Sequence, residues 1–174
     1  MSDAFRSVVI LASGIIMGIF FSLTTVSPAK GEDALRLVSR QDVCLAQNIY
    51  HEARSQDTIG KLAVGLVTLN RVKDSRWPNT VCGVVFDSQR GINNMPKRNK
   101  CQFSWFCDGK SDRIHEQQVY EDIVELLSAV YFLSSSPVLD LTKGATHYHT
   151  YKVEPYWSTK LEKIANIGDH IFYR

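Results

Sequence analysis

The sequence has almost no excess of charge of either sign. It holds 20 Lys and Arg against 18 Asp and Glu, a net charge of +2. Nucleic-acid-binding proteins typically present a dense basic face, so this balance argues against nucleic acid as a partner. Glycine and proline are scarce, at 10 and 5 of 174 residues, which excludes a collagen-like or low-complexity chain. Since 44% of the residues are hydrophobic and no internal repeat is visible, we expect one globular domain.

Several common catalytic and metal-binding motifs are missing. There is no G-x-S-x-G motif, no HExxH motif and no paired C-x₂-C spacing. Four cysteines in a domain that we expect to be exported favour disulfides over zinc. They allow three pairings, and the sequence does not select one. Cys101 and Cys107 are close enough in sequence to close a local loop, so the working prediction is Cys101–Cys107 with Cys44–Cys82.

The first 29 residues have the pattern of a targeting segment. No charged residue occurs from Ser7 to Ala29, and the 19 residues from Val8 to Val26 are about as long as a bilayer-spanning helix. Small residues around Pro28 suit a signal peptidase. We expect residues 1–29 to be a signal peptide or a signal-anchor helix that contacts the membrane. The rest of the chain would then work in the periplasm, anchored to the inner membrane, or be secreted after cleavage.

Helices are expected to dominate the exported part of the chain. Apolar residues recur with helical spacing in three segments, at 41–54, 58–72 and 113–133. A short element is expected at 80–86, between the second and the third segment. Asn70 extends the apolar stripe of the second helix, so its amide should be buried and hydrogen-bonded. Ser111 and Asp112 are the N-cap candidates of the third helix.

The remaining segments predict a loop and a small sheet. Residues 87–100 are polar and basic, with glycine, asparagine and proline, which is typical of a surface loop. Residues 146–150 and 171–173 are rich in aromatic and β-branched types, which favour strands. These patterns together predict an α-rich α+β domain whose small sheet lies toward the C-terminus.

Glu52 is a candidate proton donor. It falls at the border of the apolar arc of the first helix, beside Leu45 and one turn from Asn48. Partial burial raises the pKa of a carboxyl group, and a raised pKa lets glutamate donate a proton near neutral pH. Taken alone this signal is weak, because a glutamate at a helix border is usually an ordinary solvated residue.

The histidines offer a competing chemistry. His147 and His149 lie two apart in a predicted strand, so both rings face the same side, and a third ligand would complete a zinc site. That arrangement would indicate a zinc-dependent amidase or peptidase. The alternative is a hydrogen-bonded cluster of aromatic rings and histidines that lines a groove. The other histidines considered are His51 and His170, the latter preceded by Asp169.

Aromatic residues favour a carbohydrate substrate. Several of them lie within or beside the polar clusters, where sugar rings could stack on them, although core packing is an equal alternative for each one. They are Tyr50, Phe103, Trp105, Phe106, Tyr148, Tyr156 and Trp157.

Beyond these patterns, the chain resembles the SleB/CwlJ-type cell wall hydrolases, which include spore-cortex-lytic enzymes. The resemblance covers nearly all of residues 42–174, in order. Its first block reads Cys-Leu-Ala-Gln-Asn-Ile-Tyr-His-Glu-Ala-Arg, from Cys44 to Arg54. The later blocks are 70–72, 77–85, 101–105, 107–109, 145–149, 155–157 and 167–173.

The resemblance implies a lysozyme-like α+β fold and an enzyme that cuts the glycan strands of peptidoglycan. Residues 41–174 would form the cell wall hydrolase domain, with 30–40 as a linker. Glu52 occupies the position of the family's catalytic acid. One departure is visible, because Ser55-Gln56 stands where the family commonly has Gly-Glu. We interpret this as loop variation, and it leaves the partner carboxylate unassigned.

With one assignable carboxylate, the predicted reaction is a lytic transglycosylation, which forms 1,6-anhydro-muramic acid. A muramidase that adds water and a zinc amidase remain the alternatives, and a non-catalytic wall binder is the non-enzyme alternative. The setting is cell wall remodelling or phage-type host lysis by a monomer, with no cofactor and no metal. The expected substrate-binding residues are Asn48, Tyr50, Asn70, Gln102, Ser104, Trp105 and Tyr148. The possible auxiliary residues are Asp108, His147, His149 and Asp169.

Overall fold

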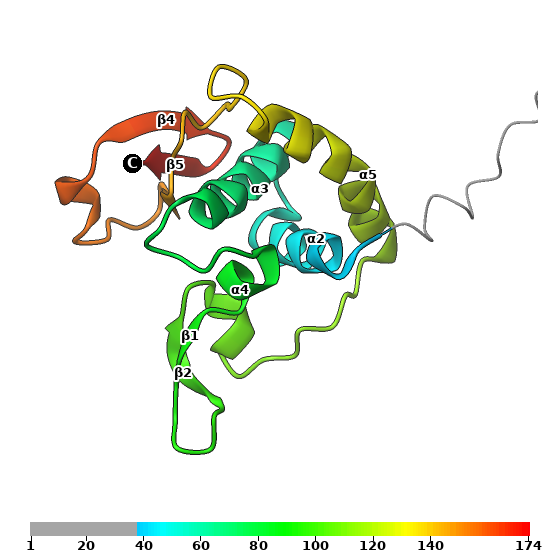
Figure 1. The fold of residues 1–174 in the computed structure, drawn as a ribbon, viewed down its shortest axis with the longest axis vertical. Helices are drawn as coiled ribbons and strands as arrows, with labels where there is room; N and C mark the ends of the chain where they lie inside the picture. The colour runs from blue at the N-terminus through cyan, green and yellow to red at the C-terminus, as the bar shows by residue number, and fades with distance from the viewer. Residues whose placement is uncertain (1–37) are drawn as a thin grey trace, which may run out of the picture.

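The structure is a computed structural model that describes residues 38–174. The predicted targeting segment, 1–29, and most of the predicted linker lie outside the described residues. In the described part, no helix is both long enough and apolar enough to cross a bilayer. Figure 1 shows helices at the centre, a sheet on one side and a hairpin that projects away from them.

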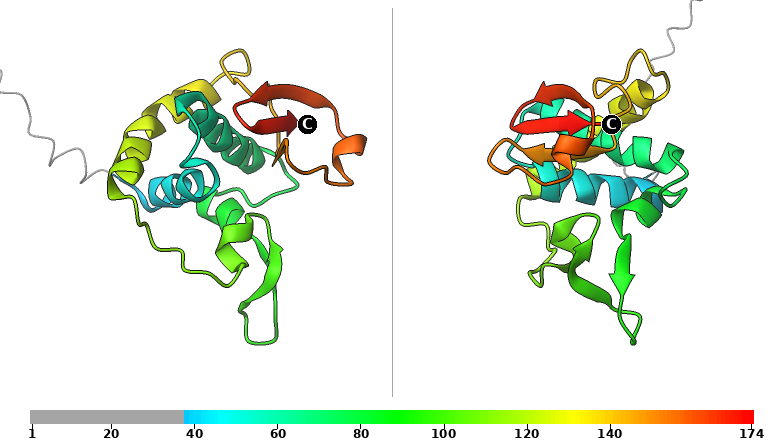
Figure 2. Two further views of the ribbon diagram at one scale, coloured as in Figure 1. Left: turned by 180° about the vertical axis from the view of Figure 1, so that it is seen from behind. Right: turned by 90° about the vertical axis from the view of Figure 1, so that its left-hand side faces the viewer.

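Three long helices pack against one another and form the main core (Figures 1 and 2). They are α2 (Arg40–Ala53), α3 (Thr58–Lys73) and α5 (Gln117–Ser134). The first begins with a capping box, in which the Ser39 hydroxyl accepts the Asp42 N–H and the Asp42 carboxylate accepts the Ser39 N–H. Asp57 caps α3 in a similar way, by accepting the Gly60 N–H at 2.8 Å. The first two helices therefore begin within one residue of their predicted positions.

Close contact between these helices depends on Gly65. A β-carbon at this position would lie 2.9 Å from a methyl group of Val130 on α5 and 3.0 Å from one of Ile49 on α2. Both distances are too short for carbon–carbon contact, so any side chain here would push the helices apart. The short helix α4 (Val81–Val85) lies where a short element was expected at 80–86; Thr80 caps it, and it covers one side of this core.

The C-terminal sheet has three antiparallel strands. They are β3 (His147–Thr150), β4 (Lys163–Ile167) and β5 (His170–Tyr173), in the order β3-β5-β4. Phe172 of the central strand packs with Ala63 and Val67 of α3 in a second small core. The predicted C-terminal sheet is confirmed, and β4 is an addition that the sequence analysis did not contain.

The prediction of a surface loop at 87–100 is wrong, because this segment contains a β-hairpin. Strands β1 (Ser88–Arg90) and β2 (Pro96–Cys101) pair antiparallel. Most of their residues are exposed, so neither strand shows the apolar–polar alternation that marks a strand with one buried face. The backbone hydrogen bonds hold a hairpin that the side-chain pattern does not reveal.

Helix α5 begins at Gln117, four residues after the predicted start, and neither Ser111 nor Asp112 caps it. The cause is a contact from α2, because the Tyr50 hydroxyl accepts the backbone N–H groups of both His115 and Glu116 at 3.1 Å. These two groups would otherwise be free to lie in the first turn of a longer helix. The segment before α5 is therefore held along α2 in a non-helical conformation.

Both predicted disulfides are present. Cys44–Cys82 joins α2 to α4, and Cys101–Cys107 joins β2 to the 3-10 helix η1 (Ser104–Cys107). In the part of the chain that the structure describes, every cysteine is paired. The first bridge fixes the helical core, and the second fixes the base of the hairpin.

The two bridges should contribute unequally to stability. They close loops that span 38 and 6 residues, and loop-closure entropy predicts about 4 and about 2 kcal/mol respectively. We therefore expect Cys44→Ala with Cys82→Ala to lower the free energy of unfolding by more than Cys101→Ala with Cys107→Ala. Urea unfolding followed by circular dichroism measures both. An equal or reversed order would show that native-state contacts, rather than chain entropy, dominate.

Candidate active site

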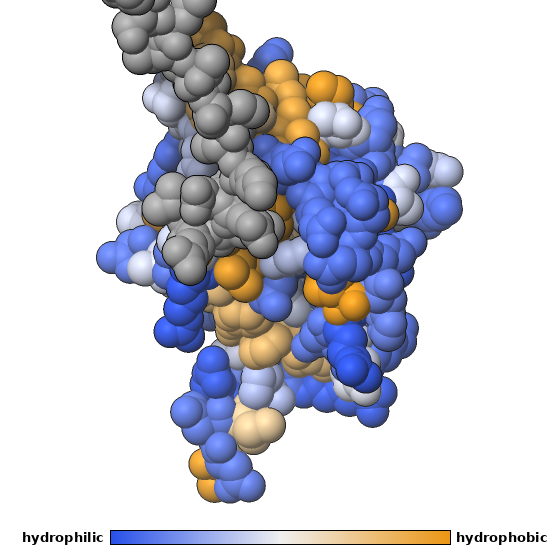
Figure 3. Space-filling model, turned by 90° about the vertical axis from the view of Figure 1, so that its right-hand side faces the viewer, coloured by the Kyte–Doolittle hydropathy of each residue, from blue (hydrophilic) through white to orange (hydrophobic). Residues whose placement is uncertain are grey.

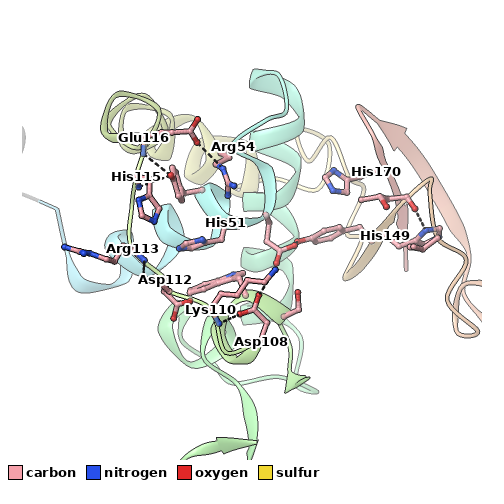
Figure 4. A pocket seen from close by; sticks show the side chains of 18 residues that line it. His51, Arg54, Asp108, Lys110, Asp112, Arg113, His115, Glu116, His149 and His170 are labelled. Carbon is pink, nitrogen blue, oxygen red and sulfur yellow. Dashed lines mark hydrogen bonds and ion pairs between the residues drawn. The ribbon is translucent and has the colours of Figure 1, made fainter. Parts of the chain in front are cut away.

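An open cleft of about 730 Å³ lies between α2, the sheet and the segment that leads into α5. Figure 4 shows Asp112 and Arg113 of that segment on one side and His149 and His170 of the sheet on the other. The cleft is lined by Tyr50, His51, Glu52, Arg54, Ser104, Trp105, Asp108, Lys110, Ser111, Asp112, Arg113, His115, Glu116, Tyr148, His149, Thr150, Val153 and His170.

Glu52 lies in this cleft, in the last turn of α2, and is partly buried. The hydroxyl of Tyr148, on β3, donates a hydrogen bond to Glu52 Oε2 at 2.9 Å. Burial raises the pKa of the Glu52 carboxyl, while the Tyr148 hydrogen bond and the charge of Arg71 act in the opposite direction. Glu52 therefore has the environment of a carboxyl group that keeps its proton above its ordinary pKa.

Arg71 is a buried charged residue close enough to Glu52 to influence its pKa, and the sequence analysis did not assign it to the site. It is buried on α3, where its Nε donates to the Thr146 carbonyl at 2.8 Å and its guanidinium lies 4.9 Å from the Phe103 ring centre. Burial lowers the pKa of this guanidinium, and the charge of Glu52 opposes that effect. Within residues 38–174, its Nη1 has no hydrogen-bond partner. The signal that the sequence offered was an arginine directly after Asn70, within the block at 70–72 that resembles the family.

Trp105 forms one wall of the cleft. The His51 ring stacks on its indole with ring centres 4.3 Å apart. Behind this wall, Trp105 Nε1 donates to Asn48 Oδ1 at 3.1 Å, and Asn48 Nδ2 donates to Thr68 Oγ1 at 3.0 Å. Asn48 is fully buried and cannot contact a substrate in the cleft. Its amide instead fixes the orientation of the Trp105 ring.

Asn70 lies away from the cleft and is a structural residue. Its amide is buried, as predicted, and donates to the Asp140 carboxylate at 2.8 Å, to Thr142 Oγ1 at 3.2 Å and to the Ala145 carbonyl at 3.1 Å. These bonds hold the turn that precedes β3. The predicted role in substrate binding is therefore not supported by its position.

Three further predicted residues lie outside the cleft. Gln102 is exposed beside the hairpin base, and its N–H donates to the Asp87 carbonyl. Asp169 accepts a hydrogen bond from Gln56 Nε2 at 3.1 Å on the surface. The ring of His147 is near Trp77 and Trp157, away from Glu52. The structure does gather Glu52 with the other predicted residues Tyr50, Ser104, Trp105, Asp108, Tyr148 and His149.

The histidines of β3 form an aromatic cluster. His147 and His149 both pack against Trp157, at 5.3 and 5.6 Å between ring centres. Both His149 ring nitrogens have an oxygen neighbour at 2.9 Å, the Tyr173 hydroxyl and the Thr150 carbonyl. Among residues 38–174, no three His, Cys, Asp or Glu side chains are placed to hold a metal ion. Both rings pack on Trp157 as in the aromatic alternative, but only His149 lines the cleft.

The carboxylates on the far side of the cleft have neighbours of their own. Asp108 accepts the Lys110 N–H at 2.8 Å, and Glu116 pairs with Arg54 Nε at 3.1 Å (Figure 4). Burial raises the pKa of the Asp112 carboxyl; the charge of His51 opposes this effect, and the charge of Asp108 adds to it. Of these carboxyl groups, none hydrogen-bonds to Glu52 in the described structure.

Asn70→Ala should destabilise the fold without a direct effect on the cleft. The change leaves the Ala145 carbonyl and Thr142 Oγ1 without this donor, while Asp140 keeps its bond from the Gly144 N–H, which predicts a loss of about 2–3 kcal/mol in urea unfolding. Asn166→Ala, at an exposed position of β4, is the matched control and should cost less than about 0.5 kcal/mol. Weaker peptidoglycan binding at unchanged stability would instead make Asn70 a substrate ligand.

Tyr148→Phe should raise the pKa of Glu52 further. The variant removes the O–H donor that stabilises the ionised carboxylate, while the ring and its burial remain. A carboxyl carbon-13 NMR titration of the labelled protein measures the shift, with Tyr151→Phe on the exposed surface as the control. An unchanged or lower pKa would mean that the Tyr148 hydroxyl does not stabilise ionised Glu52.

Comparison with known proteins places these features in a family. The sequence model of the Cell Wall Hydrolase family matches residues 55–173. The spore cortex-lytic enzyme of Halalkalibacterium halodurans is 26% identical over 129 residues, which cover 74% of this chain and 33% of the relative. That of Bacillus cereus is 41% identical over 59 residues, 33% of this chain and 23% of the relative. The matches thus span about a quarter to a third of these relatives.

Two solved structures have a similar fold. One is the catalytic domain of Bacillus cereus SleB, with a TM-score of 0.56 and 28% identity, covering 78% of this chain and 91% of that one. The other is the catalytic domain of the germination-specific lytic transglycosylase SleB from Bacillus anthracis, with the same TM-score, identity and share of this chain, and 96% of that one. The predicted α-rich α+β fold and the resemblance are thereby confirmed, and the chain belongs to the Cell Wall Hydrolase family.

Proposed function

We propose that this protein cuts the glycan strands of peptidoglycan between N-acetylmuramic acid and N-acetylglucosamine, as a lytic transglycosylase with Glu52 as its acid and base. The observation that carries this proposal is the position of Glu52, partly buried in an open cleft and hydrogen-bonded by Tyr148 at 2.9 Å. Because the family match begins at residue 55, the role of Glu52 is argued from this geometry.

In the proposed first step, protonated Glu52 gives its proton to the glycosidic oxygen, and the bond from that oxygen to C1 of muramic acid breaks. The C6 hydroxyl of the same sugar then attacks C1, and ionised Glu52 removes the hydroxyl proton. A 1,6-anhydro ring forms, Glu52 is protonated again, and no water is consumed. Between the two proton transfers, the Tyr148 hydroxyl and the charge of Arg71 stabilise the carboxylate.

This route needs one carboxylate, whereas a glycoside hydrolase ordinarily needs two. On the far side of the cleft, Asp108 accepts the Lys110 N–H and Glu116 pairs with Arg54, which favours the one-carboxylate route. Asp112, with a pKa raised by burial, is the residue that would serve a muramidase. The Trp105 indole offers an aromatic wall and Ser104 a hydroxyl in the same cleft, which suits contact with a sugar.

We also propose that the protein is exported and acts as a monomer, in cell wall remodelling or in host lysis. Two disulfides are typical of proteins in oxidising compartments outside the cytoplasm. The sequence pattern of residues 1–29 supports attachment to the inner membrane, or secretion after cleavage. The proposed chemistry itself needs no cofactor.

The test is mass spectrometry of muropeptides released from purified peptidoglycan by the wild type and by Glu52→Gln. Products that end in 1,6-anhydro-muramic acid, reduced at least about 1,000-fold by the variant, are the expected result, because the amide cannot transfer the proton. Glu125→Gln makes the same chemical change at an exposed position of α5 and should leave the products unchanged. Reducing-end products one water heavier would indicate a muramidase, and cleaved stem peptides with intact glycan would indicate an amidase.

The pH dependence of stability shows whether Glu52→Gln folds like the wild type. Because the pKa of Glu52 is raised in the fold, its ionised form costs stability as pH rises through that pKa. The variant should therefore be more stable than the wild type at pH 7, by about 0.5–2 kcal/mol. The difference should disappear below the ordinary pKa of about 4.5. A lower melting temperature at pH 7 would show that the substitution damages the fold.

A further inference from the structure

The hairpin formed by residues 88–101 projects from the body of the protein (Figures 1 and 2). Its tip carries two large apolar side chains in water, since Ile92 is fully exposed and Met95 is 68% exposed. Figure 3 shows this tip as an isolated hydrophobic spot at the end of a hydrophilic arm. Apolar side chains at the end of an arm can contribute nothing to the protein's own core, which suggests a role in contact with another surface.

The arm behind the tip is cationic. Residues 88–101 contain four basic side chains, Arg90, Lys97, Arg98 and Lys100, and no acidic one. All four are exposed, and none takes part in a salt bridge within residues 38–174. These charges exceed the net charge of +2 of the whole chain, so the remainder of the protein is net acidic. The net positive charge of the protein thus comes from the hairpin, which also carries the apolar tip.

The hairpin is held in one geometry at both ends. At the tip, the Gly91 N–H donates to the Met95 carbonyl at 2.9 Å, and Arg90 Nη1 donates to the Asn94 carbonyl at 3.0 Å. At the base, the Cys101–Cys107 disulfide ties β2 to η1. The cleft takes none of its lining residues from 88–101, so a surface that covers the hairpin can leave the cleft open.

We propose that this hairpin docks on a bilayer that contains anionic phospholipid, with Ile92 and Met95 in the interface and the four cations at the lipid phosphates. Basic side chains behind an apolar end are the combination that gives peripheral binding to anionic membranes. A hydrated polyanion would pair with the cations and would gain nothing from the apolar tip. This docking is independent of the proposed catalytic reaction and adds a second, membrane-facing surface to the protein.

The test uses the full chain with a tryptophan reporter, Ile92→Trp, and vesicles of phosphatidylglycerol and phosphatidylcholine with brominated acyl chains. Lipid bromine quenches tryptophan emission only on close approach, so the reading is local to the tip whatever else contacts the vesicle. Val138→Trp, at another side chain that is 92% exposed, is the matched control, and the wild type gives the baseline of the native tryptophans. The expected result is quenching of the tip reporter at least about twice that of the control.

Charge is tested in the same reporter background. Lys97→Gln with Arg98→Gln should lower the quenching at limiting lipid by at least about three-fold, because each cation near an anionic surface raises membrane affinity roughly five-fold. Lys152→Gln with Lys160→Gln makes the same change in net charge at exposed positions elsewhere and should have no effect.

Three results would overturn the proposal. The first is quenching of the tip reporter that is no greater than that of the Val138→Trp control. The second is an equal loss of quenching in the variant with Lys97→Gln and Arg98→Gln and in the control variant with Lys152→Gln and Lys160→Gln. The third is equal quenching by vesicles of phosphatidylcholine alone. Binding of soluble polyphosphate that Lys97→Gln with Arg98→Gln abolishes, without quenching by lipid, would indicate a polyanion site in place of a membrane-docking surface.

Discussion

The hydrogen bond from Tyr148 to Glu52 is the contact on which the candidate site depends, because it ties the carboxyl group on α2 to the C-terminal sheet. Its two residues are 96 positions apart in sequence. Tyr148 is held in turn by β5, where its ring packs against Phe172 at 5.7 Å between ring centres. Phe172 belongs to the second core, which fixes the sheet on α3. The position of one acidic oxygen therefore depends on the docking of two separate layers.

The same contact also affects the protonation of Glu52, on which burial has the largest effect. Burial favours the neutral acid, whereas Tyr148 and Arg71 favour the carboxylate. The acid–base role proposed for Glu52 needs both protonation forms, which fits the opposed influences of burial and of Tyr148 with Arg71. Arg71 lies in a buried position, among aromatic rings and one backbone carbonyl, and burial lowers its own pKa. A buried cation is costly unless nearby groups offset the cost, and Tyr148, Glu52 and Asp87 are the groups whose charges favour the charged guanidinium here.

Features set by local periodicity could be predicted from the sequence, and those set by distant partners could not. The starts of α2 and α3 were predicted within one residue, because caps and apolar spacing are encoded within a few positions. The start of α5 is decided by the Tyr50 hydroxyl, which is 65 positions from His115. The hairpin at 88–101 was missed for another reason. Its strands are exposed on both faces, so pairing of their backbones leaves no side-chain pattern.

The candidate site shows the limit of helical periodicity as a guide to function. Projected along the axis of α2, Asn48 and Glu52 fall on the same side, one turn apart, and the sequence analysis names both as site residues. The two residues differ in their position along the helix axis and therefore in which elements cover them. Asn48 lies where α3 and η1 cover the helix, and its amide is taken up by Thr68 and Trp105. Glu52 lies in the last turn, where the sheet covers it only in part and the cleft reaches it. The neighbouring elements decide how far each side chain is buried. Tertiary packing therefore makes Asn48 a residue that positions Trp105 and leaves Glu52 as the candidate acid.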